Sequence, residues 1–131
     1  MRAAFIGCVQ FSAAMLEELL GLRDLELCGV VTRKSSVANA DFVDLATIAQ
    51  RHSLPVLHAT GNEQGVIAEW LATLNIDIVF CLGWSYLLKP DVLAIPPRGV
   101  LGYHPAMLPR NRGRHPIIWA LALGLPDRAL P

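Results

Sequence analysis

A histidine near the carboxyl end of the chain, His104, is the residue best suited to acid–base chemistry. It lies in the stretch 102–116, GYHPAMLPRNRGRHP, where glycines, prolines, arginines and a second histidine are crowded together. A neutral imidazole near neutral pH can transfer a proton or donate a hydrogen bond to a developing oxyanion. The spacing also fits a structural histidine that is hydrogen-bonded between a strand end and a proline turn.

Three arginines follow this histidine at alternate positions, Arg110, Arg112 and Arg114. In an extended loop they would point the same way and form a small cationic patch. That patch is either a solvated face or a clamp for the phosphate of a nucleotide, a tRNA end or a nucleotide sugar. His115, just before a helix, is either a cap-like residue or a substrate contact. The net charge is zero, so a local contact is expected rather than a broad nucleic-acid surface.

The sequence gives little support for metal, dinucleotide or disulfide chemistry. His104 and His115 have no third ligand nearby, so we expect no zinc site. The first strand-to-helix turn, 7–12, has one glycine where a dinucleotide fingerprint needs three. The cysteines are odd in number and lie in apolar runs, which predicts buried thiols in a reducing compartment, the cytoplasm. They are Cys8, Cys28 and Cys81.

Five apolar runs predict the strands that position these residues. The runs are short and bounded by turn residues, as in a parallel sheet that is covered on both faces. They are residues 3–9, 26–32, 54–57, 76–82 and 99–103. Pro55 places the third run at an edge of the sheet, because proline cannot donate to a strand ladder.

Apolar residues at helical spacing predict helices between these strands. The predicted helices are 12–20, 41–50, 62–74, a short turn within 85–93, and 116–124. Ser12 is expected to cap the first helix and Gly21 to end it. We expect a loop at 33–40, and we expect His52 and His58 at the surface.

This alternation predicts an α/β fold, a Rossmann-like three-layer arrangement with a mostly parallel sheet. Ligands of such sheets bind beyond the carboxyl ends of the strands, and His104 follows the last predicted strand directly. The chain has 131 residues, which suits one domain, and 53% of them are hydrophobic. It holds no run of eighteen apolar residues, so we expect no membrane partner.

Several segments resemble the folate-dependent formyltransferase family, which includes methionyl-tRNA formyltransferase, glycinamide ribonucleotide formyltransferase and sugar N-formyltransferases. The most specific segment is the pattern His-Pro-x-x-Leu-Pro-x-x-Arg-Gly at 104–113. The others are FIG at 5–7, LCGVVT at 27–32, FCLGW at 80–84, GV at 99–100, the proline at 116 and WA at 119–120.

The resemblance implies that residues 1–131 form the N-terminal domain of such an enzyme. The co-substrate would be 10-formyltetrahydrofolate, and the acceptor a primary amine of the methionyl-tRNA or amino-sugar type. His104 would be the catalytic residue. Two segments would contact the folate: Ser85, Tyr86, Leu87 and Leu88, and Ala106, Met107, Leu108 and Pro109. Asn111, Arg112 and His115 would face the acceptor.

Two positions depart from the family pattern. The family has an asparagine two residues before the histidine, where this chain has Gly102. That asparagine would donate a hydrogen bond to the oxyanion. The family also has a catalytic aspartate beyond the segment matching 116–124, and Asp127 comes too early to correspond to it.

The second departure predicts that this chain lacks the C-terminal strands of the domain and has little or no activity alone. It also predicts self-association through an exposed sheet edge. The alternative function is a non-catalytic α/β module that binds a nucleotide or another anion through the arginine-rich loop 110–114.

Overall fold

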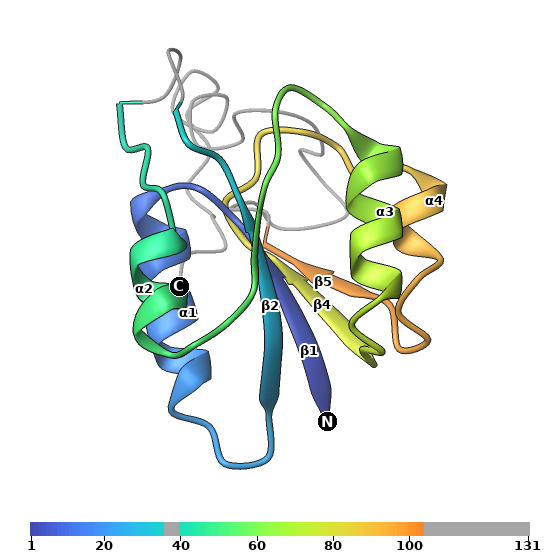
Figure 1. Ribbon diagram of the computed structural model, residues 1–131, viewed down its shortest axis with the longest axis horizontal. Coiled ribbons are helices and arrows are strands. Elements are labelled where there is room, and N and C mark those ends of the chain that lie inside the picture. The colour runs from blue at the N-terminus through green and yellow to red at the C-terminus, as the bar shows by residue number, and fades with distance from the viewer. Residues whose placement is uncertain (36–39, 104–131) are drawn as a thin grey trace, which may run out of the picture.

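The computed structural model describes residues 1–35 and 40–103, and within them five strands form one parallel sheet (Figure 1). The strand order is β3-β2-β1-β4-β5. The strands are β1 (Arg2–Ile6), β2 (Glu26–Thr32), β3 (Val56–His58), β4 (Ile78–Cys81) and β5 (Val100–Gly102). The central strand is therefore the first in the chain. The predicted edge position of the Pro55 segment is confirmed, because β3 is an outer strand.

Helices cover both faces of this sheet (Figure 1). They are α1 (Gln10–Leu20), α2 (Ala46–Arg51), α3 (Gln64–Ala72) and α4 (Pro90–Leu93). In Figure 1, α1 and α2 lie on one side of the strands, and α3 and α4 lie on the other. The predicted Rossmann-like, three-layer arrangement is confirmed.

Two separate apolar clusters fill the spaces between the sheet and its helices. Neighbouring residues of β1 and β2 alternate between them: Phe5 and Val30 belong to one cluster, Ile6 and Val31 to the other. Because both sides of these strands are buried, their sequences are continuous apolar runs rather than alternating ones. This is why the strands could be predicted from hydrophobicity alone.

Three predicted helix starts are wrong, that of α3 by two residues, because it begins at Gln64 rather than residue 62. The first helix begins at Gln10 with Val9 as its N-cap residue. Ser12 lies buried within the first turn, where its hydroxyl accepts from the Val9 amide, so it supports the helix start without being the N-cap. The second begins at Ala46 rather than residue 41. The segment before it is held by the β1–α1 turn, because the amide of Val43 donates to the Cys8 carbonyl at 2.8 Å. Because of this contact, residues 41–45 do not form the helical turn that their apolar spacing predicts.

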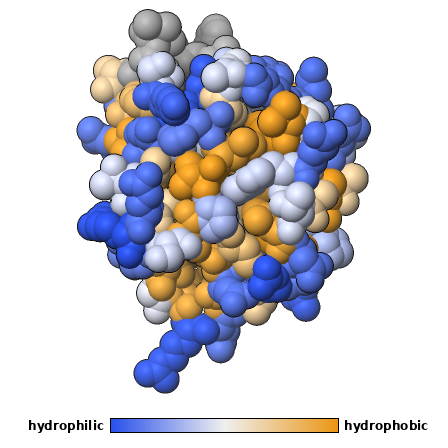
Figure 2. All heavy atoms as spheres, in the orientation of Figure 1, coloured by the Kyte–Doolittle hydropathy of each residue, from blue (hydrophilic) through white to orange (hydrophobic). Residues whose placement is uncertain are grey.

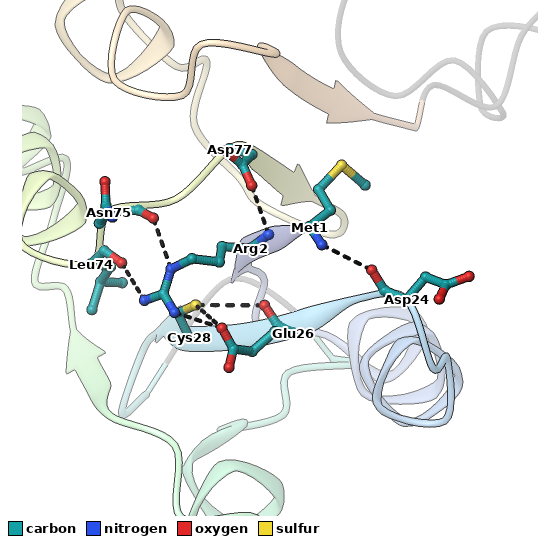
Figure 3. Close-up of polar contacts among 8 residues, drawn as sticks. All are labelled: Met1, Arg2, Asp24, Glu26, Cys28, Leu74, Asn75 and Asp77. Atoms are coloured by element: carbon teal, nitrogen blue, oxygen red, sulfur yellow. Dashed lines mark hydrogen bonds and ion pairs between the residues drawn. The ribbon is translucent and has the colours of Figure 1, made fainter.

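Arg2, the first residue of β1, ties the amino-terminal end of the sheet to the end of α3 (Figure 3). Its guanidinium donates from Nη2 to the Leu74 carbonyl at 2.7 Å and from Nε to the Asn75 carbonyl at 2.9 Å. Its Nη1 also pairs with Glu26 Oε2 at 2.5 Å. The backbone amide of Arg2 donates to the Asp77 carboxylate at 2.8 Å. One side chain thus links β1, β2 and the connection from α3 to β4.

Replacing Arg2 with alanine is expected to lower the free energy of unfolding by about 2 kcal/mol, because two carbonyls lose charged donors. Urea denaturation measures this. Arg2→Lys keeps the charge beside Glu26 but cannot reproduce the forked geometry, so it should restore less than half of the loss. Glu26→Gln removes only an exposed ion pair and should cost less than about 1 kcal/mol. Equal losses for Arg2→Ala and Glu26→Gln would contradict this account.

Several large apolar side chains remain exposed. Leu87 is 89% exposed, and Leu101 of the outer strand β5 is 53% exposed. Figure 2 shows apolar surface gathered over the middle of one face, in front of β2 in the view of Figure 1. Self-association through this kind of surface stays a prediction. Among the described residues, no helix has the length and hydrophobicity needed to cross a membrane.

Candidate functional site

The carboxyl ends of β1 and β4 meet at the point where the strand order of the sheet reverses. From β1 the chain proceeds outward to β2 and β3, then crosses to β4 and β5 on the other side. Open α/β sheets bind ligands in the crevice at such a switch point. The amide of Leu82 donates to the Ile6 carbonyl at 2.9 Å, and the amide of Cys8 to the Gly83 carbonyl at 3.1 Å. The two strand ends are thus in direct contact.

Ser12 joins these strand ends to α1. Its hydroxyl is fully buried and donates to the Leu82 carbonyl at 2.5 Å, while it accepts from the Val9 amide at 3.2 Å. Gly7 and Gly83 flank it so closely that a Cβ on either would collide with the serine side chain. These contacts hold the carboxyl ends of β1 and β4 against the first turn of α1.

Backbone amides at the start of α1 are already hydrogen-bonded within the protein. The Gln10 amide donates to the Asp41 carbonyl at 3.0 Å, and Val9 forms an antiparallel bridge with Phe42. In dinucleotide-binding folds, amides of this turn face a pyrophosphate. Here two of these amides, those of Gln10 and Cys8, donate to the carbonyls of Asp41 and Gly83 instead. The arrangement is therefore consistent with the poor match of this turn to a dinucleotide fingerprint.

His58 was predicted at the surface, but it is only partly exposed and pairs with Asp44, in the segment before α2. Its Nε2 lies 3.0 and 3.1 Å from the two carboxylate oxygens of Asp44, and both side chains are half-buried. Asp44 also accepts from the Ala46 amide at 2.9 Å, which fixes the start of α2. The pair has a structural role. His52 is exposed, as predicted.

The segment after β4 contains the first group of predicted folate contacts, Ser85 to Leu88. Tyr86 is packed between two neighbours: the Arg33 guanidinium lies 5.3 Å from its ring centre, and the Trp84 ring lies 6.3 Å away in an edge-on arrangement. Such a cation–π contact contributes about 0.5–1 kcal/mol at a partly exposed site. The segment is therefore held in place from the end of β2 as well as from β4.

Arg33 was placed in a loop by the sequence, and no site role was predicted for it. Its position directly after a buried strand is the one feature that could have marked it. The Nε of Arg33 and the indole nitrogen of Trp84 are both buried, and neither has a hydrogen-bond partner among the described residues. Both groups can only donate. An acceptor for each of these two nitrogens is therefore missing from the described part of the chain.

The cysteines are poor candidates for chemistry. Burial raises the pKa of the Cys81 thiol to about 12 and also raises the pKa of Cys8, which is fully buried. Cys28 is half-buried, and its pKa is raised by burial too. Protonated thiols are weak nucleophiles near neutral pH, which favours the predicted structural role. Among the described residues, no group of three or more His, Cys, Asp or Glu side chains is arranged to hold a metal ion.

The last described residues bring the chain to the candidate site. Gly102 ends β5 opposite Cys81 and is exposed. Tyr103 follows, and its ring lies 5.2 Å from the ring of Phe11 in the first turn of α1. The residue before His104 is thus beside the switch point. Most of the predicted site lies outside the described residues: His104, Ala106, Met107, Leu108, Pro109, Asn111, Arg112 and His115.

Comparison with known proteins identifies the relatives of this chain. Residues 1–127 match the family model described as "Formyl transferase". Methionyl-tRNA formyltransferase from Roseiflexus sp. (strain RS-1) is 35% identical over 129 residues, which cover 95% of this chain and 39% of the relative. The corresponding protein of Ehrlichia ruminantium (strain Welgevonden) is 30% identical, with 95% and 42% covered. The chain thus spans about two-fifths of the length of these curated relatives.

Solved structures agree on the fold. Glycinamide ribonucleotide transformylase 1 from Symbiobacterium toebii superposes with a TM-score of 0.76 at 20% identity, covering 95% of this chain and 61% of that one. A formyltetrahydrofolate deformylase from Pseudomonas syringae pv. tomato gives a TM-score of 0.70 at 15% identity, covering 95% and 42%. Family match, relatives and fold agree, and the chain belongs to the formyl transferase family.

Proposed function

We propose that this chain provides the folate side of a formyl transfer site, with 10-formyltetrahydrofolate as donor and a primary amine as acceptor. The observation that carries the proposal is the segment Ser85–Leu88. It leaves β4 at the switch point of the sheet and is held there by packing on Arg33 and Trp84. Family membership over residues 1–127 supports a folate donor. The buried donors of Arg33 and Trp84 suit a ring system rich in acceptors.

His104 is the proposed proton-transfer group. The amine nitrogen attacks the formyl carbon, the new C–N bond forms, and the bond from that carbon to N10 of the folate breaks. The amine loses a proton and N10 gains one, so a single imidazole can accept the first and deliver the second. The segment Ala106–Pro109 is proposed to contact the folate. Asn111, Arg112 and His115 are proposed to contact the acceptor.

The acceptor is proposed to be methionyl-tRNA or an amino sugar. The names of the curated relatives favour methionyl-tRNA. Residues 1–131 are proposed to act as an N-terminal domain, and a cytoplasmic location stays a prediction. The nucleotide- or anion-binding alternative rests on the loop 110–114, which lies outside the described residues. The comparisons favour the formyl transferase reading.

Calorimetry tests the proposal. Titration with 5-formyltetrahydrofolate, a stable folate, is expected to show binding, whereas UDP and ATP are expected to show none at the same concentrations. Formyl transfer assayed with labelled 10-formyltetrahydrofolate is expected to be far below that of a full-length methionyl-tRNA formyltransferase. Tight nucleotide binding without folate binding would replace this proposal with the anion-binding module. Turnover equal to that of the full-length enzyme would contradict the predicted low activity.

A further inference from the structure

Gln64, the first residue of α3, is a buried polar residue for which neither the fold nor the proposed chemistry has given a role. The residue is 6% exposed, although glutamine is usually a surface residue. It contacts the segment after β4, more than twenty residues further along the chain. A buried amide is stable only where its polar atoms are bonded, so these partners explain its position.

The amide of Gln64 binds the backbone of the candidate folate segment on both sides of Leu88. Its Oε1 accepts from the Lys89 amide at 3.0 Å, and its Nε2 lies 3.4 Å from the Leu87 carbonyl. Nε2 also donates to Asn62 Oδ1 at 2.5 Å. The Lys89 N–H can only donate, so Oε1 of Gln64 must face it. Nε2 of Gln64 then faces the Leu87 carbonyl and Asn62 Oδ1.

These contacts decide which side chains of the segment are buried. With both flanking backbone groups bound to Gln64, Leu88 packs on the apolar cluster beneath α3, while Leu87 is turned outward and is 89% exposed. Tyr86, one residue earlier, is packed by Arg33 and Trp84. The segment is therefore fixed at two points, one from β2 and β4 and one from α3.

We propose that Gln64 is a positioning residue that holds residues 87–89 in the conformation that binds the folate. For its ligand this inference rests on the proposed function. When a segment is already ordered in the free protein, binding does not carry the entropy cost of ordering it. The affinity is then higher than for a segment that the ligand must order. Gln64 acts through the backbone of Leu87 and Lys89 and need not touch the ligand.

Amide hydrogen exchange tests the positioning without any ligand. In Gln64→Leu the exchange of the Lys89 amide is expected to be at least roughly tenfold faster, since its acceptor is gone. Amides of β1 and β4 should be unchanged. Gln50→Leu is the matched control, because Gln50 is exposed on α2, in the opposite layer. A Lys89 amide that exchanges freely in the wild type, or equally in Gln64→Leu, would overturn the inference.

Folate titration tests the consequence for binding. Gln64→Leu is expected to bind 5-formyltetrahydrofolate roughly tenfold more weakly, and Gln50→Leu as the wild type does. Gln64→Glu provides a rescue. At pH 7 its carboxylate can accept from Lys89 but cannot donate to the Leu87 carbonyl, whereas the protonated acid can do both. Affinity relative to the wild type should therefore recover as the pH falls towards 5.

The outcomes separate this inference from the proposed function. If the wild type fails to bind the folate, the proposed function fails, while hydrogen exchange still decides whether Gln64 holds the segment. If the wild type binds and Gln64→Leu binds equally well, the positioning role is wrong and the proposed function stands. If Gln64→Leu does not fold, two other variants provide the test. Asn62→Ala, which removes only the support of the Gln64 amide, is expected to speed exchange of the Lys89 amide, and Gln64→Glu is expected to bind the folate more tightly at pH 5 than at pH 7, relative to the wild type.

Discussion

Gly102→Asn is expected to raise the rate of formyl transfer by roughly 100- to 1000-fold, the usual effect of one oxyanion donor. The family resemblance implies an asparagine at this position, two residues before His104. The described part of the chain leaves room for an asparagine side chain. Among the described residues, the nearest neighbour of a Cβ on Gly102 would be the Cys81 carbonyl, at an ordinary contact distance of 3.6 Å. Because Gly102 is exposed at the end of β5, the side chain can extend towards the carboxyl edge of the sheet.

The assay is release of labelled formate from 10-formyltetrahydrofolate, which reports attack by water and needs no knowledge of the amine acceptor. Gly102→Asp is the matched control, since it has nearly the same shape as Gly102→Asn but no N–H donor when ionised. Gly102→Asp should leave the rate at or below that of the wild type. Equal rates for the two variants, with unchanged melting, would show that the oxyanion does not lie near residue 102.

Gly83→Ala is expected to lower the free energy of unfolding by about 3 kcal/mol, from two separate causes. Gly83 has a φ of +85°, which costs a non-glycine residue about 1 kcal/mol or more. The added Cβ would also collide with Ser12 Oγ and Val9 Cγ2, and overpacking of this kind costs about 1–3 kcal/mol. The serine cannot move away freely, because its hydroxyl is bound to the Leu82 carbonyl.

Gly61→Ala separates the two causes. Gly61 also has a positive φ, +57°, but no atom of residues 1–35 or 40–103 lies within 4 Å of the position of an added Cβ. Only backbone strain remains there, so its cost should be about 1 kcal/mol. Chemical denaturation of both variants gives the comparison. If Gly83→Ala costs no more than Gly61→Ala, the close approach of β4 to α1 at Ser12 is not important for stability.

The strands were predictable and the contacts at their ends were not. Strands β1, β2 and β4 could be recognised because burial on both faces produces uninterrupted apolar runs, as around Phe5 and Ile6. The start of α2 was missed because the bond from the Val43 amide to Cys8 joins segments far apart in sequence. Local propensity cannot include such a partner, and here the tertiary contact prevails.

The same reason explains which parts of the candidate site were missed. Ser12 has the right residue type for a helix cap, but its hydroxyl finds a buried carbonyl 70 residues away. Arg33 and Gln64 are ordinary polar residues in their own segments, and only the fold brings them to the turn after β4. The assignment of Tyr86 and Leu87 to a folate-contacting segment came from a resemblance of motifs rather than from contacts, and it stays a prediction.

The central place of β1 has a consequence for how the chain folds during synthesis. β1 emerges first and pairs with β2 after a short connection, but its other neighbour is β4, and the Arg2–Asp77 contact spans 75 residues. Contacts of such long range form slowly because the loop must close first. One edge of the central strand therefore stays open until β4, which ends at Cys81, has left the ribosome. During that interval the edge is exposed to non-native strand pairing, and the two halves of the candidate site are still apart.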